Sequence, residues 1–202
     1  MTPFSYLTIQ AAATGIYKEK GSKFLAFAFP VVSEDEVKDH IKALRKEYFD
    51  ARHHGYAYML GSGKEKYRAF DDGEPAHSTG DPILGQIKSR DLTQVLVVVV
   101  RYFGGVKLGV GGLINAYRTA AEQALNCAII IQKEVTEQFE LIYDYAATPE
   151  TMRLVKEFDL TILSQNFEER CRMLIESKLR NRDAFLEKIK LLKALGVKID
   201  LT

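Results

Sequence analysis

The sequence predicts an α+β protein in two domains, and three observations lead to this prediction. The chain has 202 residues, a length that suits two small domains better than one large core. An uninterrupted aliphatic run at 95–100 predicts a buried strand, and a glycine-rich loop and a helix follow it directly. After residue 134 the pattern of elements starts again. We therefore expect one domain over 1–134 and a second over 135–202.

In the first domain, local signals predict two strands around one helix. Aromatic and small residues alternate over 23–30, which is typical of a half-buried strand. Ser33 and Glu36 then have the spacing of a capping box, and apolar residues at helical spacing follow them. A second strand is expected over 54–60. The order is therefore strand, amphipathic helix, strand.

Glycine and proline separate the elements that follow. We expect a turn at 61–64 and an ordered acidic loop over 70–82. The run at 95–100 is β-branched on both faces, which favours a central strand covered on both sides. The helix after the glycines is expected to bury one face, formed by Leu113, Tyr117, Ala120, Ala121 and Ala124.

The second domain is predicted to contain four strands and two helices. The strands are expected at 135–143, as two pieces within 160–177, and at 197–201. One helix is expected to begin with Thr148 as its cap, and the other to cover 182–195. This βαββαβ order is that of the ferredoxin-like fold.

Composition and charge limit the classes of function. The formal net charge is only +1, so the chain lacks the basic excess of a nonspecific nucleic-acid binder, and any RNA contact must use a local patch. Cys127 and Cys171 lie far apart, and we expect two buried, reduced thiols and no metal site. No leader or membrane-spanning run is recognisable, which predicts a cytosolic protein without membrane contact. No signal favours a particular oligomeric state.

The glycine-rich segment 101–113 is the strongest local signal for binding. Glycines before a helix leave backbone N–H groups free for a phosphate or another anion, although they also permit positive φ angles and tight helix–strand packing. Neither the phosphate-loop nor the dinucleotide motif is complete, so no nucleotide cofactor is predicted. The candidate anion-binding or RNA-binding residues are Arg101, Gly104, Gly105, Lys107, Gly109, Gly111, Gly112 and Arg118.

The acidic loop supplies weaker candidates for catalysis. General acid–base chemistry or a hard cation would use such a group of carboxylates, whereas Asp and Ser or Thr also build turns by bonding backbone amides. Adjacent residues of a strand face opposite sides, so at most one of His53 and His54 reaches any site. The catalytic candidates are Asp71, Asp72, Glu74, His53 and His77.

Aromatic residues interleave with basic ones in the first domain. Such a mixture is able to form a stacking surface for single-stranded RNA, or the aromatics belong to the core. The aromatic residues concerned are Tyr56, Tyr58, Tyr67, Tyr102, Phe103 and Tyr117.

Three segments together resemble the signature of the YigZ/IMPACT family: 51–58, the acidic loop with 79–84, and 97–113. The resemblance implies an amino-terminal domain like the second domain of ribosomal protein S5. It also implies a ferredoxin-like domain similar to the last domain of translocation elongation factors, and a role in translation control. The family usually has positive charges where this chain has Asp81 and Asn115, which weakens the prediction of polyanion binding here.

We therefore expect a translation-associated binding or regulatory protein that engages RNA, the ribosome or a ribosome-associated factor. One alternative is a small-molecule or hydrolytic enzyme that uses the acidic loop opposite the glycine loop, which requires the carboxylates to converge in a cleft. Another is a pure protein-interaction module, which requires a large apolar patch. A binding protein is favoured over an enzyme.

Overall fold

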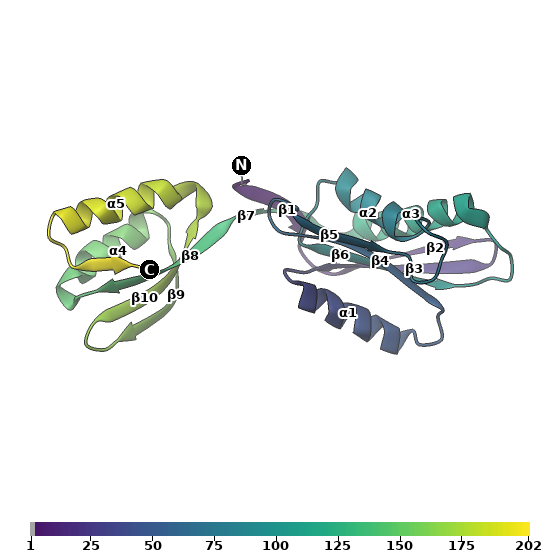
Figure 1. The fold of residues 1–202 in the computed structure, drawn as a ribbon, viewed down its shortest axis with the longest axis horizontal. Coiled ribbons are helices and arrows are strands. Elements are labelled where there is room, and N and C mark those ends of the chain that lie inside the picture. Colours follow the sequence, from purple (N-terminus) through teal and green to yellow (C-terminus); the bar gives the residue numbers. More distant parts are fainter. Residues whose placement is uncertain (1–2) are drawn as a thin grey trace. The chain divides into compact units, whose positions relative to one another are not determined.

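The structure is a computed structural model that describes residues 3–202, and the chain divides into two compact units (Figure 1). The first unit extends to Lys133, and the second begins at Glu134. Both units combine helices with antiparallel sheet, so the predicted α+β class is confirmed. No helix within residues 3–202 is long and apolar enough to cross a membrane.

A five-stranded antiparallel sheet forms the centre of the first unit. Its central strand, β6, has no exposed surface at any residue from Val95 to Val100, as the aliphatic run predicts. The strands in spatial order are β2 (Ala13–Glu19), β3 (Ser22–Pro30), β6 (Val95–Tyr102), β4 (His53–Leu60) and β5 (Lys66–Phe70).

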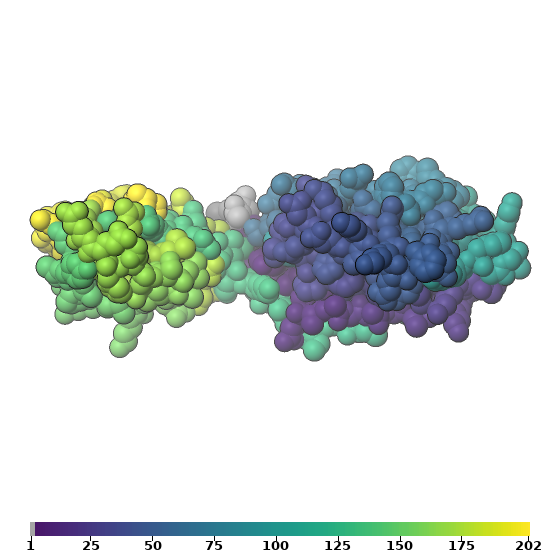
Figure 2. Space-filling view, turned by 90° about the horizontal axis from the view of Figure 1, so that it is seen from below, coloured from purple at the N-terminus to yellow at the C-terminus, as the bar shows by residue number. Residues whose placement is uncertain are grey.

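Helices cover both faces of this sheet (Figure 1). α1 (Glu34–Glu47) packs on one face and is turned toward the viewer in Figure 2, while α2 (Gly80–Ser89) and α3 (Gly109–Cys127) pack on the other. The predicted cap of α1 is present, since the Ser33 hydroxyl accepts a bond of 3.2 Å from the backbone N–H of Glu36. α3 buries the predicted face of leucine, tyrosine and alanines.

Several elements of the first unit differ from the prediction. The predicted loop over 70–82 is too long, because α2 begins at Gly80. The strands β2 and β5 were not predicted, and neither was the two-stranded sheet of β1 (Ser5–Ile9) and β7 (Ile130–Glu134). Cys127 is exposed and only Cys171 is buried, because the helix that carries Cys127 ends at that residue.

The second unit has the predicted ferredoxin-like topology, with sheet order β11-β8-β10-β9 and antiparallel pairing throughout. Thr148 is the first residue of its helix rather than the cap, because a short 3₁₀ turn (Tyr145–Ala147) precedes it. A second 3₁₀ turn covers Leu179–Asn181. The elements are β8 (Thr136–Tyr143), α4 (Thr148–Glu157), β9 (Thr161–Phe167), β10 (Cys171–Lys178), α5 (Arg182–Ala194) and β11 (Ile199–Leu201).

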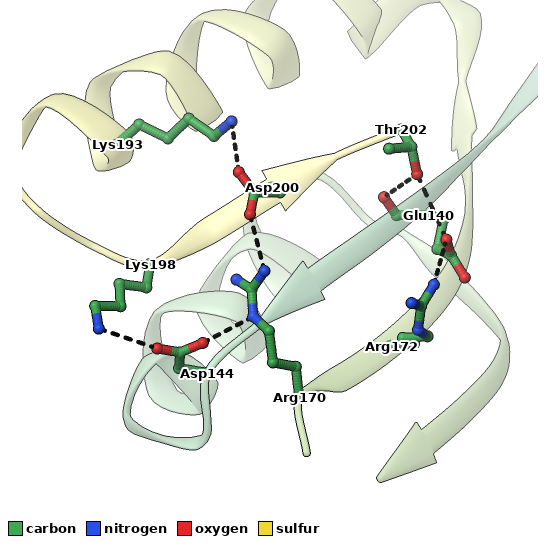
Figure 3. Close-up of polar contacts among 8 residues, drawn as sticks. All are labelled: Glu140, Asp144, Arg170, Arg172, Lys193, Lys198, Asp200 and Thr202. Carbon is green, nitrogen blue, oxygen red and sulfur yellow. Dashed lines mark hydrogen bonds and ion pairs between the residues drawn. The ribbon is translucent and has the colours of Figure 1, made fainter. Parts of the chain in front are cut away.

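Ion pairs join the three-residue strand β11, which pairs with β8 at the edge of the second sheet, to neighbouring segments (Figure 3). Asp200 accepts bonds from Lys193 Nζ at 3.0 Å and from Arg170 Nη1 at 3.1 Å. Arg170 Nε also bonds Asp144 at 2.8 Å, and Asp144 lies just after β8. The hydrogen bonds from Lys193 and Arg170 lower the pKa of Asp200, because they stabilise its charged form.

A pH titration tests the role of Asp200. The pKa of Asp200 is lower in the folded chain than in the unfolded chain, where it is about 4. Asp200 therefore stabilises the fold at pH values above the unfolded pKa. This contribution is lost as the pH falls through the folded pKa. We expect Asp200→Asn to speed hydrogen exchange of the Thr202 amide at pH 7, and the two proteins to converge once the pH has fallen below the folded pKa of Asp200. An unchanged difference at acid pH would contradict the assignment.

A pair of glycine substitutions tests the packing of the glycine segment. A Cβ on Gly104 would lie 1.8 Å from the carbonyl carbon of Gly21, which is backbone and cannot move freely. A Cβ on Gly111 would have no atom within 4 Å. We expect Gly104→Ala to lower the free energy of unfolding by about 3 kcal/mol, the upper end of overpacking costs. Gly111→Ala should raise it by up to about 1 kcal/mol, as alanine does inside a helix. Urea denaturation of both variants measures the difference, and equal effects would refute it.

Candidate functional site

A cleft of about 440 Å³ lies beside the glycine segment in the first unit. Its walls come from the start of β4, the end of β6, the acidic loop and the N-terminus of α3. Residues from both motifs singled out in the sequence therefore meet in one place. The lining residues are Arg52, His53, Glu74, Pro75, Arg101, Phe103, Lys107, Leu108, Gly109, Val110 and Leu113.

Arg101 and Glu74 form a buried ion pair at this cleft. Arg101 lies in one row across the sheet with Phe24 of β3 and His53 of β4. Its Nη1 donates to Glu74 Oε1 at 2.5 Å, and both side chains are more than nine-tenths buried. The Phe24 and Phe103 rings lie near the guanidinium, with centroids 5.5 and 5.6 Å from Cζ. The cation is therefore held in a defined orientation.

Tyr117 of α3 completes the pair. Its hydroxyl donates to the same Glu74 oxygen at 2.8 Å. Burial is the main cause that raises the pKa of Tyr117, and the nearby charge of Glu74 raises it further. The phenol therefore stays neutral and acts as a donor. Glu74 thus connects β6, through Arg101, to α3.

Arg101 retains unused hydrogen-bonding capacity. Its Nε is buried and has no hydrogen-bond partner within the part of the chain that the structure describes. A buried donor without a partner costs about 1–3 kcal/mol, more for a charged group. An acceptor supplied by a ligand would remove this cost.

The mouth of the cleft carries two exposed cations and one exposed aromatic ring. Arg52 precedes β4, and Lys107 lies in the segment between β6 and α3. The Phe103 side chain is 56% exposed. Arg52 and Lys107 are 55 positions apart in the sequence, and only the fold brings them to one cleft.

The N-terminus of α3 faces the same cleft. Gly109 and Val110, its first two residues, line it together with Leu108 at the cap position. Within the described chain no side chain caps this helix, and its first turn has no acidic residue. The free N–H groups and the positive end of the helix dipole therefore favour an anion here.

The five catalytic candidates do not converge. Only Glu74 and His53 line the cleft. Asp71 accepts backbone N–H bonds from His77, Thr79 and Gly80 at 2.8–2.9 Å, so it caps α2 and shapes the loop. These contacts are those of a turn-building residue.

The other loop residues also have separate structural contacts. Asp72 pairs with Arg45 of α1 at 2.6 Å and accepts the backbone N–H of His54 at 2.7 Å. His77 Nδ1 lies 2.6 Å from Asp81 on an exposed surface. Within residues 3–202 no group of three or more His, Cys, Asp or Glu side chains is able to hold a metal ion.

The two adjacent histidines occupy different environments. The ring of His53 lines the cleft, and its Nδ1 lies 2.9 Å from the carbonyl oxygen of Asp72. His54 is buried, and the loss of solvent lowers its pKa, which keeps its ring neutral at pH 7.

The candidate anion-binding residues have different environments in the structure. Gly104 serves packing, because its N–H donates to the Ser22 hydroxyl at 3.1 Å and its Cα leaves no room for a side chain beside Gly21. Gly105 and Gly109 have positive φ angles of 88° and 71°. Arg118 lines a separate hollow with His77 and Asp81. The remaining candidates are Arg101 and Lys107 at the cleft, and Gly111 and Gly112 in the first turn of α3.

Most of the aromatic candidates belong to the core. Tyr56, Tyr58 and Tyr117 are buried, and the partly buried Tyr102 packs against a core cluster, whereas Phe103 and Tyr67 are exposed. Sequence reasoning missed the contribution of Val110 and the pairing of Arg101 with Glu74. The 27-residue separation of that pair gives no periodic signal.

Comparison with known proteins gives consistent results. The profile of the Impact N-terminal domain matches residues 20–125, which is more than half of the chain. The IMPACT family member YigZ of Escherichia coli (strain K12) is 30% identical over 166 residues, which cover 81% of each chain. The IMPACT family member YvyE of Bacillus subtilis (strain 168) is 29% identical over 183 residues, covering 91% of this chain and 84% of YvyE.

A solved structure extends the likeness to the whole fold. The crystal structure of a hypothetical protein has a TM-score of 0.76 and 27% identity, and the match covers 98% of this chain and 97% of that one. The profile match, the relatives and this structure agree with the signature segments found in the sequence. The chain belongs to the IMPACT family.

Proposed function

We propose that this chain is a translation-associated binding protein, and that the cleft of its first unit binds phosphate groups of single-stranded RNA. One observation carries the proposal: Arg52, Lys107 and the exposed ring of Phe103 meet at the uncapped N-terminus of α3. Cations and a helix N-terminus attract phosphate, and an exposed aromatic ring stacks on a base.

A local site of this kind is compatible with the near-neutral chain. The net charge of +1 excludes a basic surface over the whole molecule, so binding must depend on a few positioned groups. Glu74 neutralises Arg101 inside the protein, and the charges at the mouth are those of Arg52 and Lys107. We expect moderate affinity with little base specificity, because the residues that line the cleft include no Asn, Gln, Ser or Thr side chain to read a base edge.

The translational setting is supported by family membership. The chain belongs to the IMPACT family, and the family resemblance implies a role in translation control. The partner in this proposal is RNA on or near the ribosome, or a ribosome-associated factor that carries it. The enzyme alternative has less support, because Asp71 and Asp72 are bonded to backbone amides and to Arg45 and do not line the cleft.

A second candidate function, protein interaction, is favoured by one observation in the second unit. β9 lies at an edge of its sheet, and all seven of its residues are exposed. The apolar residues Ile162, Leu163 and Phe167 are among them. Exposed sheet edges with apolar side chains are typical places for another protein chain to pair.

Salt-dependent RNA binding tests the first function. We expect the double variant Arg52→Ala, Lys107→Ala to bind a single-stranded RNA more weakly than the wild type. The slope of log affinity against log salt concentration should be shallower by about 1.4, because two phosphate contacts are lost. Lys42→Ala, Lys46→Ala in α1 changes the net charge equally without touching the cleft and should keep the wild-type slope. Fluorescence anisotropy at several salt concentrations measures both.

Equal slopes for the two double variants would place RNA elsewhere on the molecule. Absence of any RNA binding by the wild type at physiological salt would reject the function itself. If the protein then bound ribosomes through protein alone, β9 would become the candidate surface.

Replacing Glu74 separates stability from binding. Glu74→Gln keeps the shape of the side chain but leaves the buried Arg101 without its countercharge, so we expect the free energy of unfolding to fall by about 3–5 kcal/mol. RNA affinity should rise, because the Arg101 charge is no longer balanced. Tyr117→Phe removes only a hydrogen bond and should cost about 1–3 kcal/mol with little change in affinity. A loss of affinity in Glu74→Gln at a temperature where it remains folded would contradict this account.

A further inference from the structure

RNA contains two chemical kinds of phosphate. A diester within the chain has one negative charge and two free oxygens, whereas a terminal monoester has close to two charges and three free oxygens near neutral pH. The two make different demands on a site. A monoester fits best where several donors and a surplus of about two positive charges surround one point.

We propose that the cleft selects a phosphomonoester carried by a nucleoside, either a free nucleotide or the phosphorylated end of an RNA chain. This inference rests on the proposed function and specifies its ligand. Three features of the cleft support it: its charge balance, its unused buried donor and its aromatic ring.

The charge balance of the cleft matches a dianion. Three lining side chains, Arg52, Arg101 and Lys107, are cationic, and one, Glu74, is anionic. The surplus is therefore two positive charges, to which the N-terminus of α3 adds about half a charge. One diester phosphate would leave more than one of these charges unbalanced.

Two independent sets of donors serve the same cleft. One set consists of the free N–H groups of the first turn of α3 next to Gly109 and Val110. The other is Arg101, which is 6% exposed and whose Nε has no partner within the described chain. Glu74 and the two phenylalanine rings hold the guanidinium in place, so little side-chain entropy is lost when an oxygen binds it.

Phe103 links the phosphate to a nucleoside. One face of its ring is turned to the guanidinium of Arg101. Phe103 is nevertheless more than half exposed. Because the ring centroid lies 5.6 Å from Cζ of Arg101, a phosphate bound at this guanidinium would lie next to the ring. The base or sugar attached to the phosphate would then contact Phe103, which inorganic phosphate alone does not do.

Val110 provides a variant that changes binding without harming the fold. Its side chain is 52% exposed, lines the cleft and occupies the first turn of α3. An aspartate there stabilises a helix through the dipole but repels an anion. We expect Val110→Asp to melt at or above the wild-type temperature and to lose phosphomonoester binding. Met152→Asp in α4 adds the same charge at an exposed position that does not line the cleft, and it should bind as the wild type does.

The binding experiment compares one RNA sequence with a 5′-phosphate, a 3′-phosphate or hydroxyls at both ends. We expect the RNA with a phosphorylated end to bind the wild type roughly tenfold tighter than the RNA with hydroxyls at both ends. A factor of this size corresponds to a hydrogen bond to a charged group. Val110→Asp should remove this preference. Displacement of the labelled RNA by adenosine 5′-monophosphate, but not by adenosine, would indicate that a free nucleotide suffices, and a lack of displacement would assign the site to RNA ends.

Two results would overturn the inference, and they are distinguishable from failure of the proposed function. If all three RNAs bind equally well, the protein binds RNA but does not select a monoester. If Val110→Asp keeps the preference for a phosphorylated end, the cleft is not the site of selection. If no RNA form binds at all, the proposed function fails together with the inference.

Discussion

The buried pair of Arg101 and Glu74 is the contact on which the cleft depends. Arg101 comes from the end of the central strand β6, and Glu74 comes from the acidic loop. Tyr117 on α3 shares the same carboxylate oxygen. Taking two charges out of water is unfavourable unless geometry and further contacts compensate. Here Glu74 accepts a second hydrogen bond from Tyr117, and the Phe24 and Phe103 rings lie near the Arg101 guanidinium. The pair therefore fixes the position of the loop and of α3 relative to the sheet.

The acidic loop is best understood as a set of separate structural contacts. Asp71 caps α2, Asp72 joins the loop to α1 and to the start of β4, and Glu74 neutralises Arg101. Asp71 and Asp72 do not line the cleft, and the charge of Glu74, which does, is paired with Arg101. A segment that resembles a catalytic cluster in sequence thus supplies structural contacts and one wall of the cleft.

Local patterns predicted the elements that depend on local physics. The aliphatic run is the buried strand β6, the capping box of Ser33 starts α1, and the helical repeat of Leu113 and Tyr117 is the buried face of α3. The order of elements also predicted the ferredoxin-like second unit. In each case the signal lies within one element or within the sequence of elements.

The parts that were not predicted depend on contacts between distant residues. α2 was missed because Asp71, which caps it, lies nine residues before Gly80 and the first residues of the helix resemble a turn. The pairing of β1 with β7 joins opposite ends of the first unit. At the site, the glycine segment was recognised, but the neutralisation of Arg101 by Glu74 and the position of Arg52 beside Lys107 arise only in the folded chain.

The central claim is that phosphate binds between Arg101 and the N-terminus of α3. Its most direct test is an NMR titration of ¹⁵N-labelled protein with a 5′-phosphorylated RNA oligonucleotide, following the Arg101 Nε resonance and the backbone amides of the first turn of α3. The account predicts that these resonances shift together and saturate at one affinity, while amides of α1 do not move. Shifts confined to β9, or an Arg101 Nε resonance that stays in place while RNA binds, would contradict it.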